Sequence, residues 1–150
     1  MTNRGNPNSP FKPVLGILVI LVAVGVIAGV ARLLRARDRI TWRTDYAAAR
    51  QESRRSGKPL MLYFTATWCP PCREMERTTW ADKEVAKALA GYVPVKLDVD
   101  RHPKLAQAFR VRPIPAFFVI KPGESERNDE ELKYGDGGKT SEEFIEWLPT

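Results

Sequence analysis

A pair of cysteines separated by two prolines constrains this chain more than any other feature of its sequence. The pair, Cys69 and Cys72, supplies the only cysteines among the 150 residues, and at this spacing two thiols can close a small disulfide ring. If the second cysteine opens a helix, the first lies at the helix N-terminus, where unpaired N–H groups and the dipole stabilise a thiolate. Pro71 fits a first turn because proline has no N–H to leave unpaired. The motif therefore predicts a nucleophilic Cys69.

Other uses of a cysteine pair remain open at this point. A structural disulfide across so short a loop constrains few residues of the unfolded chain and stabilises less than a long one. A zinc site needs four ligands, and the chain offers two cysteines and one distant His102. A copper(I) dithiolate carrier is chemically reasonable, although the double proline stiffens the loop. We favour a redox-active dithiol and predict no metal site.

The segments around the motif predict an alternation of strands and helices. Leu60 to Ala66 is a short run of bulky apolar residues and predicts a buried strand just before the cysteines. The remaining expected elements are a helix after Cys72, a helix capped by Asp82, a strand over 92–99, a helix over 103–110, strands over 115–120 and 131–134, and a helix capped by Thr140. This order predicts an α/β fold with parallel and antiparallel pairing.

Two segments of the chain resemble the thioredoxin superfamily, and the resemblance extends from about Ile40 to the C-terminus. They are Phe64-Thr65-Ala66-Thr67-Trp68-Cys69-Pro70-Pro71-Cys72 and Val111-Arg112-Pro113-Ile114-Pro115-Ala116. The run from Cys72 to Val85 is similar to the C-terminal domain of the membrane thiol reductase DsbD and related anchored proteins. The resemblance implies a thioredoxin-like fold, in which helices flank a central mixed sheet. Here we expect one N-terminal transmembrane helix to precede it.

The resemblance also implies roles for individual residues. Cys69 is expected to attack the substrate and Cys72 to resolve the mixed disulfide from a buried position. Pro115 is expected to be a cis-proline facing the pair, and a cis bond is far more accessible before proline than elsewhere. The expected substrate-binding residues are Trp68, Ile114 and Pro115, and the expected active-site loop is Pro70 and Pro71.

The chain departs from the usual thioredoxin pattern at three places near the motif. Tyr63 stands where the pattern has a buried aspartate that assists proton removal from the resolving thiol, and Thr67 replaces an acidic residue. Glu74 or Glu76, one turn into the helix, is a candidate substitute for that proton relay. The alternative is that both glutamates form a solvated helix face. The usual Gly-Pro dipeptide is replaced by Pro70-Pro71, so the family's redox potential cannot be transferred to this chain.

The N-terminal part of the chain contains a long apolar run. Val14 to Ala31 consists of 18 residues that are all apolar or glycine, and a helix of about 20 residues is long enough to cross a hydrocarbon core. We therefore expect a membrane anchor rather than a cleaved signal peptide, for which Gly29-Val30-Ala31 would be the processing site. The expected organisation is a disordered tail over 1–13, an anchor over 14–34, a basic linker over 35–41 and a thioredoxin-like domain over 42–150.

Basic residues are concentrated around this apolar run. The chain carries a formal charge of +6, but beyond the first 40 residues 18 basic residues face 17 acidic ones. No nucleic-acid partner is therefore expected, since its surface would need the excess on the folded part. The arginines that follow the run favour a cytoplasmic domain. The family resemblance favours an extracytoplasmic one, and we expect a single-pass protein of a bacterial-type inner or plasma membrane with that orientation.

The expected function is that of a membrane-anchored thiol–disulfide oxidoreductase, and the resemblance favours a protein-disulfide reductase in cell redox homeostasis. Its partners would be protein thiols or disulfides and an upstream thiol electron donor. The Cys69–Cys72 disulfide would serve as the redox centre without a separate cofactor. The alternative is a binding module that holds unfolded thiol proteins or copper(I) without turnover. The oligomeric state is not predicted by the sequence.

Overall fold

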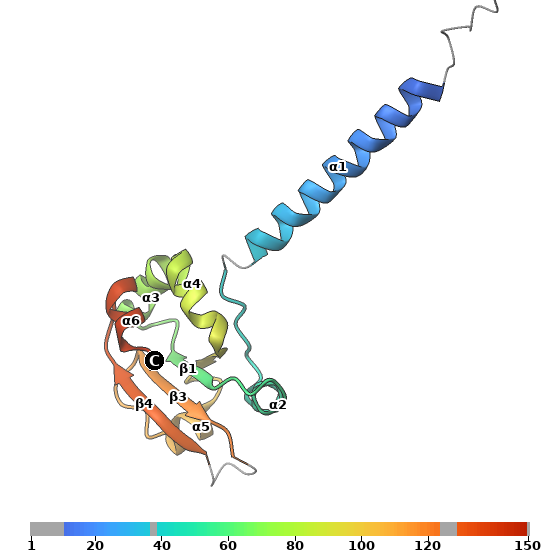
Figure 1. The fold of residues 1–150 in the computed structure, drawn as a ribbon. Helices are drawn as coiled ribbons and strands as arrows, with labels where there is room; N and C mark the ends of the chain where they lie inside the picture. The colour runs from blue at the N-terminus through green and yellow to red at the C-terminus, as the bar shows by residue number, and fades with distance from the viewer. Residues whose placement is uncertain (1–10, 37–38, 124–128, 150) are drawn as a thin grey trace, which may run out of the picture. The chain divides into compact units, whose positions relative to one another are not determined.

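The computed structural model describes residues 11–36, 39–123 and 129–149, and the chain divides into two units after Ala36 (Figure 1). The first unit contains α1 (Phe11–Ala36). Within the described ranges, no helix combines the length and the apolar character needed to cross a membrane. The transmembrane helix expected over 14–34 is thus not supported by the structure. Residues 1–10 of the expected tail and 37–38 of the expected linker lie outside the described residues.

The second unit is built on a mixed four-stranded sheet. Its strands are β1 (Leu60–Thr65), β2 (Val93–Asp98), β3 (Ala116–Lys121) and β4 (Glu130–Asp136), in the order β2-β1-β3-β4. The β1 strand pairs in parallel with β2 and antiparallel with β3, which pairs antiparallel with β4. Every residue of β1 is buried, as expected for a central strand covered on both faces. The predicted mixed α/β fold is confirmed.

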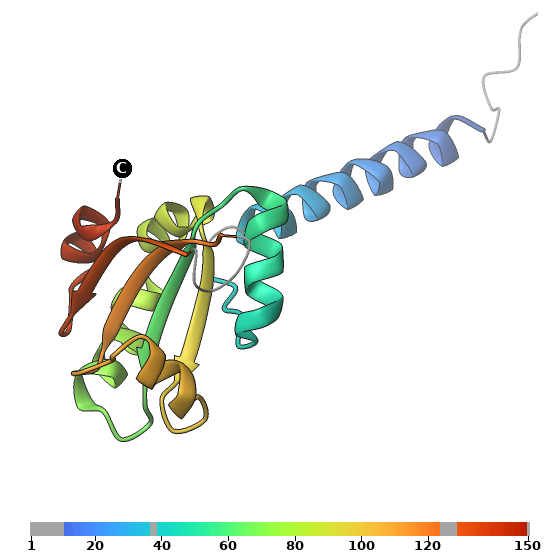
Figure 2. The ribbon, with the colours of Figure 1, turned by 90° about the horizontal axis from the view of Figure 1, so that it is seen from below.

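Helices cover both faces of this sheet (Figure 2). They are α2 (Tyr46–Ser56), α3 (Pro70–Arg77), α4 (Lys83–Ala88), α5 (Pro103–Ala108) and α6 (Ser141–Trp147), with short 3₁₀ turns η1 (Thr79–Ala81) and η2 (Leu89–Gly91). Both predicted N-caps are confirmed. Asp82 accepts from the Glu84 N–H at 2.7 Å, and Thr140 forms a capping box with Glu143. The α2 helix was not predicted.

Alternate residues of β1 divide the interior into two cores. Leu60, Leu62 and Phe64 pack with α2 and the region of α5. Met61 and Tyr63 pack on the opposite face with α3, α4 and α6. In this second core, the Trp80 ring lies edge-on to the Phe117 and Phe144 rings, a favoured aromatic geometry. The two cores fix the end of β1 and the start of α3, where the cysteines lie.

Candidate active site

The cysteine pair lies where β1 ends and α3 begins. Cys69 and Cys72 form a disulfide with their Cα atoms 5.3 Å apart. Cys69 is the N-cap of α3, and its Sγ accepts from the Cys72 N–H at 3.3 Å. Pro70 and Pro71 occupy the first two helical positions, where the absent N–H groups leave nothing unpaired. The predicted helix N-terminus at Cys69 is confirmed, and it is an environment that favours a thiolate.

The loop before β3 lies against the disulfide. Cys69 Sγ is 3.8 Å from the carbonyl oxygen of Ile114, and Ile114 packs on the two cysteines and Ala66. The Ile114–Pro115 peptide is cis, as expected, and the Arg112–Pro113 peptide, for which no isomer was predicted, is cis as well. The chain thus presents backbone polar groups at the edge of the sulfur pair. The role of this loop in binding substrate stays a prediction.

Trp68 forms an exposed surface beside the disulfide. Its side chain is 60% exposed, and its Nε1 donates to Asp100 Oδ2 at 2.8 Å. The two cysteines are only 1–2% exposed, so the sulfurs are recessed next to this ring. An exposed aromatic ring beside a recessed reactive group can contact a substrate chain.

The two candidate relay glutamates lie in different environments. Glu74 is exposed and forms an ion pair with Arg77, one turn further along the same helix. Glu76 is half-buried, and its Oε1 lies 2.5 Å from Lys96 Nζ. That oxygen has almost no exposed surface and makes no hydrogen bond of good geometry. The attraction to Lys96 therefore offsets the cost of burying it. The structure therefore brings Glu76, but not Glu74, to the inner side of α3.

Tyr63 is hydrogen-bonded to the start of α3 and is paired across the sheet with Lys96. Its side chain is fully buried, and its hydroxyl donates to the Cys72 carbonyl oxygen at 3.4 Å. Burial raises the pKa of Tyr63, the Thr65 and Trp80 side chains oppose that rise, and the Glu76 carboxylate adds to it. We call Tyr63, Cys72, Glu76 and Lys96 the inner cluster.

Lys96 and the role of Tyr63 in this cluster were not predicted from the sequence. Tyr63 and Lys96 are directly paired in the register of β1 and β2, which the sequence does not show. Cys72 and Glu76 are one helical turn apart on α3, which places them on one face. The spacing of Cys72 and Glu76 can be read from the sequence, but it points to this cluster only once the strand register is known.

A cavity of about 560 Å³ lies beside Glu76 and Lys96 of the inner cluster. It is lined by Thr44, Thr65, Ala66, Thr67, Arg73, Glu76, Lys96, Asp98, Arg101 and His102. His102, which the sequence left without a role, thus lines the same cavity as Glu76 and Lys96. In the described part of the chain, no three His, Cys, Asp or Glu side chains gather as metal ligands would.

The fold and the site define a dithiol domain of the thioredoxin type, and known proteins are similar to it. A sequence model described as thioredoxin-like matches residues 41–122. Thioredoxin H2-2 of rice (Oryza sativa subsp. japonica) is 33% identical over 95 residues, which are 63% of this chain and 66% of the rice protein. The chain thus spans slightly less than two thirds of that relative. The chain belongs to the thioredoxin-like family.

Two solved structures support the same assignment. A thioredoxin from Thermus thermophilus has a TM-score of 0.63 and 26% identity, covering 71% of this chain and 84% of that one. The oxidised DsbD C-terminal domain of Neisseria meningitidis has a TM-score of 0.58 and 25% identity. The match covers 71% of this chain and 96% of that domain. The predicted superfamily is confirmed, and a DsbD C-terminal domain is among its structural neighbours.

Proposed function

We propose that this protein is a thiol–disulfide oxidoreductase that reduces disulfides in protein substrates. The observation that carries the proposal is the position of Cys69, which caps α3 with its sulfur beside the Ile114 carbonyl. A helix N-terminus favours the thiolate form of this sulfur in the reduced protein. The adjacent backbone offers polar groups to an extended substrate segment. Relatives named thioredoxin support the same class of activity.

The reaction exchanges two electrons in two steps. The Cys69 thiolate attacks one sulfur of the substrate disulfide, that S–S bond breaks, and one substrate thiolate leaves. Cys72, as a thiolate, then attacks Cys69 Sγ, the mixed disulfide breaks, and the second substrate thiolate leaves. The product is the Cys69–Cys72 disulfide that the structure contains. An upstream thiol donor would reverse both steps on the protein and restore the dithiol, so no separate cofactor takes part.

Glu76 is the proposed acceptor of the Cys72 proton. The Cys72 thiol must lose its proton before it attacks, and a carboxylate one helical turn away on the same face is suitably placed. Lys96 pairs with this carboxylate, and the cavity beside it leads the proton to solvent. Glu74, exposed and paired with Arg77, has no such position.

A turnover assay tests the proposed activity. Reduction of insulin with a recycling thiol reductant should proceed with the wild-type protein and stop in Cys69→Ser. A copper(I) titration run in parallel addresses the alternative of a binding module. Tight stoichiometric copper binding without insulin reduction would replace the proposed function with that alternative.

We further propose that residues 14–34 attach the domain to a bacterial-type inner or plasma membrane, with the domain on the extracytoplasmic side. The proposal is supported by the uninterrupted apolar run and by the large apolar side chains described between Ile17 and Val30, which are 49–68% exposed in α1. Side chains of this size seldom stay in water in such a continuous set.

Fractionation tests this attachment. The protein should stay in the membrane fraction through alkaline carbonate washing, and protease added to intact spheroplasts should digest the domain. Release by carbonate would contradict the anchor. Full protection until lysis would contradict the orientation and agree with the positive-inside tendency of the arginines that follow the run.

A further inference from the structure

The Tyr63 hydroxyl contacts the Cys72 carbonyl and has other polar side chains near it. It donates to the Cys72 carbonyl at 3.4 Å, which is long for an O–H···O hydrogen bond and therefore weak. The register of β1 and β2 pairs Tyr63 with Lys96, whose Nζ lies 2.5 Å from the Glu76 carboxylate. That carboxylate also adds to the rise in the pKa of Tyr63. A hydroxyl has one hydrogen to donate, so it serves either the carbonyl or the carboxylate.

A second buried polar group next to Tyr63 lacks a partner. Trp80 Nε1 is buried and makes no hydrogen bond of good geometry with any described residue. The Trp80 and Tyr63 rings are in contact, with centroids 4.9 Å apart. A buried unpaired N–H is costly, and such a group calls for an explanation. A hydroxyl oxygen can accept one hydrogen bond while its hydrogen is donated elsewhere, so the Tyr63 hydroxyl can donate to Glu76 and still accept from the indole.

We propose that Tyr63 is a positioning residue, whose hydroxyl holds the Glu76 carboxylate against Lys96 beneath Cys72 while that carboxylate waits for the Cys72 proton. This inference rests on the proposed thiol–disulfide exchange. During resolution the proton moves from the Cys72 thiol to Glu76, and the electron pair left on sulfur forms the bond to Cys69. Tyr63 keeps its own proton throughout.

The charged groups around Glu76 explain why a neutral donor is useful there. Lys96 faces the carboxylate from β2, and the cavity beside it also carries Arg73, Asp98, Arg101 and His102. Lys96 and Glu76 are each about one third exposed, so solvent screens their attraction. An ion pair of that kind leaves the carboxylate free to swing into the cavity. A hydrogen bond from a fully buried, immobile tyrosine restricts it to one place.

Stopped-flow kinetics on Tyr63→Phe test this role. The reduced protein is mixed with an aromatic disulfide that releases one coloured thiolate on attack by Cys69 and another on resolution by Cys72. Attack depends on disulfide concentration and resolution does not, so the two rates separate. We expect resolution in Tyr63→Phe to slow roughly tenfold, as for loss of one hydrogen bond to a charged group, with the attack rate unchanged.

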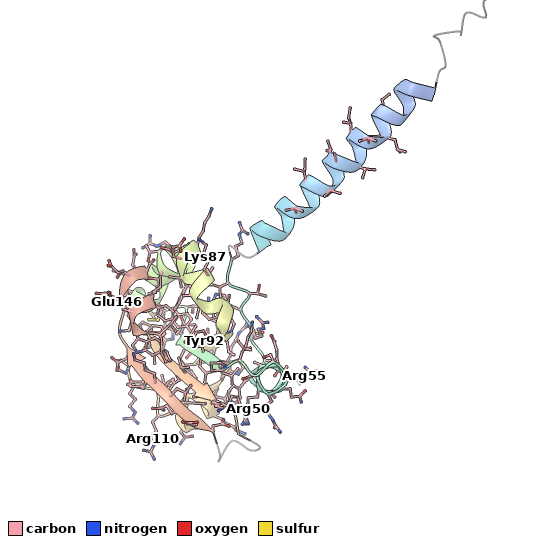
Figure 3. All side chains as sticks on the ribbon, in the orientation of Figure 1. Arg50, Arg55, Lys87, Tyr92, Arg110 and Glu146 are labelled. Carbon is pink, nitrogen blue, oxygen red and sulfur yellow. A yellow bond between two sulfur atoms is a disulfide. The ribbon has the colours of Figure 1, made fainter. Side chains whose placement is uncertain are left out.

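Tyr92→Phe is the matched control. Its hydroxyl donates to the Pro149 carbonyl at 2.7 Å, at the C-terminal end of the chain, and Figure 3 labels its position. This variant loses a tyrosine hydroxyl without touching the inner cluster, so both rates should remain those of the wild type. The double variant Tyr63→Phe/Glu76→Gln should resolve no more slowly than Glu76→Gln alone, because the two residues act through one proton transfer.

Three outcomes would overturn the inference. The first is a wild-type resolution rate in Tyr63→Phe. The second is a variant in which attack and resolution slow by the same factor. The third is a double variant whose resolution rate falls by the product of the two single-variant factors. Failure of the proposed function itself would look different, since Cys72→Ser would then form no mixed disulfide, and the inference would be overturned with it. With trapping intact and Tyr63→Phe unaffected, the exchange reaction stands and only the positioning role is lost.

Discussion

The two sides of α3 differ in how closely they follow the thioredoxin-like pattern. On the outer side, Cys69 and Trp68 occupy motif positions; Cys69 caps the helix as predicted, and Trp68 is exposed as predicted. On the inner side, Tyr63 replaces the usual aspartate, and Glu76 and Lys96 supply the charges. Thiolate stabilisation is local, because a helix start provides it. In the proposed mechanism, proton removal depends on groups from three elements, so it can be rebuilt from different residues.

The sharpest test of the outer side is the division of labour between the cysteines, and it has the largest expected effect. Cys69→Ser should abolish exchange, because the one remaining thiol, Cys72, is buried. Cys72→Ser should keep the first step and accumulate mixed disulfides through Cys69, since resolution is lost. Non-reducing electrophoresis with mass spectrometry of the trapped species measures both.

The same experiment can contradict the proposed difference between the two sides of α3. Equal trapping by both variants would mean that α3 does not distinguish the two sulfurs. Alkylation of the reduced protein adds a second reading, with Cys69 expected to react first at neutral pH because it caps the helix. Earlier reaction of Cys72 would move the nucleophile to the inner side.

Removing the carboxylate from the inner side has the next largest expected effect. Glu76→Gln keeps the size of the side chain but accepts no proton, so resolution by Cys72 should slow by about 10²-fold, at the low end of general base effects. Attack by Cys69 should be unaffected. The two-phase release of coloured thiolate measures both rates.

Glu74→Gln is the matched control for that variant. It removes a carboxylate from the same helix, but from an exposed position paired with Arg77. Its resolution rate should be within about twofold of the wild type, as expected for an exposed ion pair of small weight. If both glutamine variants resolve normally, then proton removal does not use α3, and the two glutamates are the solvated face that the sequence also allowed.

The contrast between the two sides also explains what the sequence could predict. The cysteine motif, the buried β1 run and the caps at Asp82 and Thr140 depend on neighbouring residues, and each was predicted correctly. The choice between Glu74 and Glu76 depended on the strand register, which pairs Tyr63 with Lys96. Sequence patterns carry no such long-range information, so both glutamates remained candidates.

The sequence-based prediction differs from the structure in two further elements, and each difference has its own cause. The α2 helix (Tyr46–Ser56) escaped prediction because its apolar side is short, with Tyr46 and Ala49 as its buried apolar residues. Its stability comes from the Asp45 cap and from packing on β1, which the sequence does not show. The predicted transmembrane helix rested on hydropathy alone, and no described helix has the required length and apolar character.

Truncating Trp68 tests the contribution of the outer surface to substrate binding. The ring is 60% exposed and lies beside recessed sulfurs, so Trp68→Ala should raise KM for a protein disulfide about tenfold, in the range of an aromatic contact residue. The Tm should hardly change. Leu132→Ala, which removes another exposed apolar side chain from β4, should leave KM unchanged. Equal effects of the two variants would show a general loss of surface hydrophobicity instead.

The smallest expected effect is that of the hydrogen bond that orients Trp68. Asp100→Ala removes the acceptor of the Trp68 Nε1 hydrogen at 2.8 Å but keeps the Asp100 N–H, which bonds to Asp98 Oδ1 and maintains the turn. An exposed hydrogen bond contributes about 0.5 kcal/mol, so KM should rise about two- to threefold. In a Trp68→Ala background the same change should have no effect, because there is no ring left to orient. A loss that persists in that background would show that Asp100 contacts the substrate directly, and the outer side would then use a charge as well as a motif.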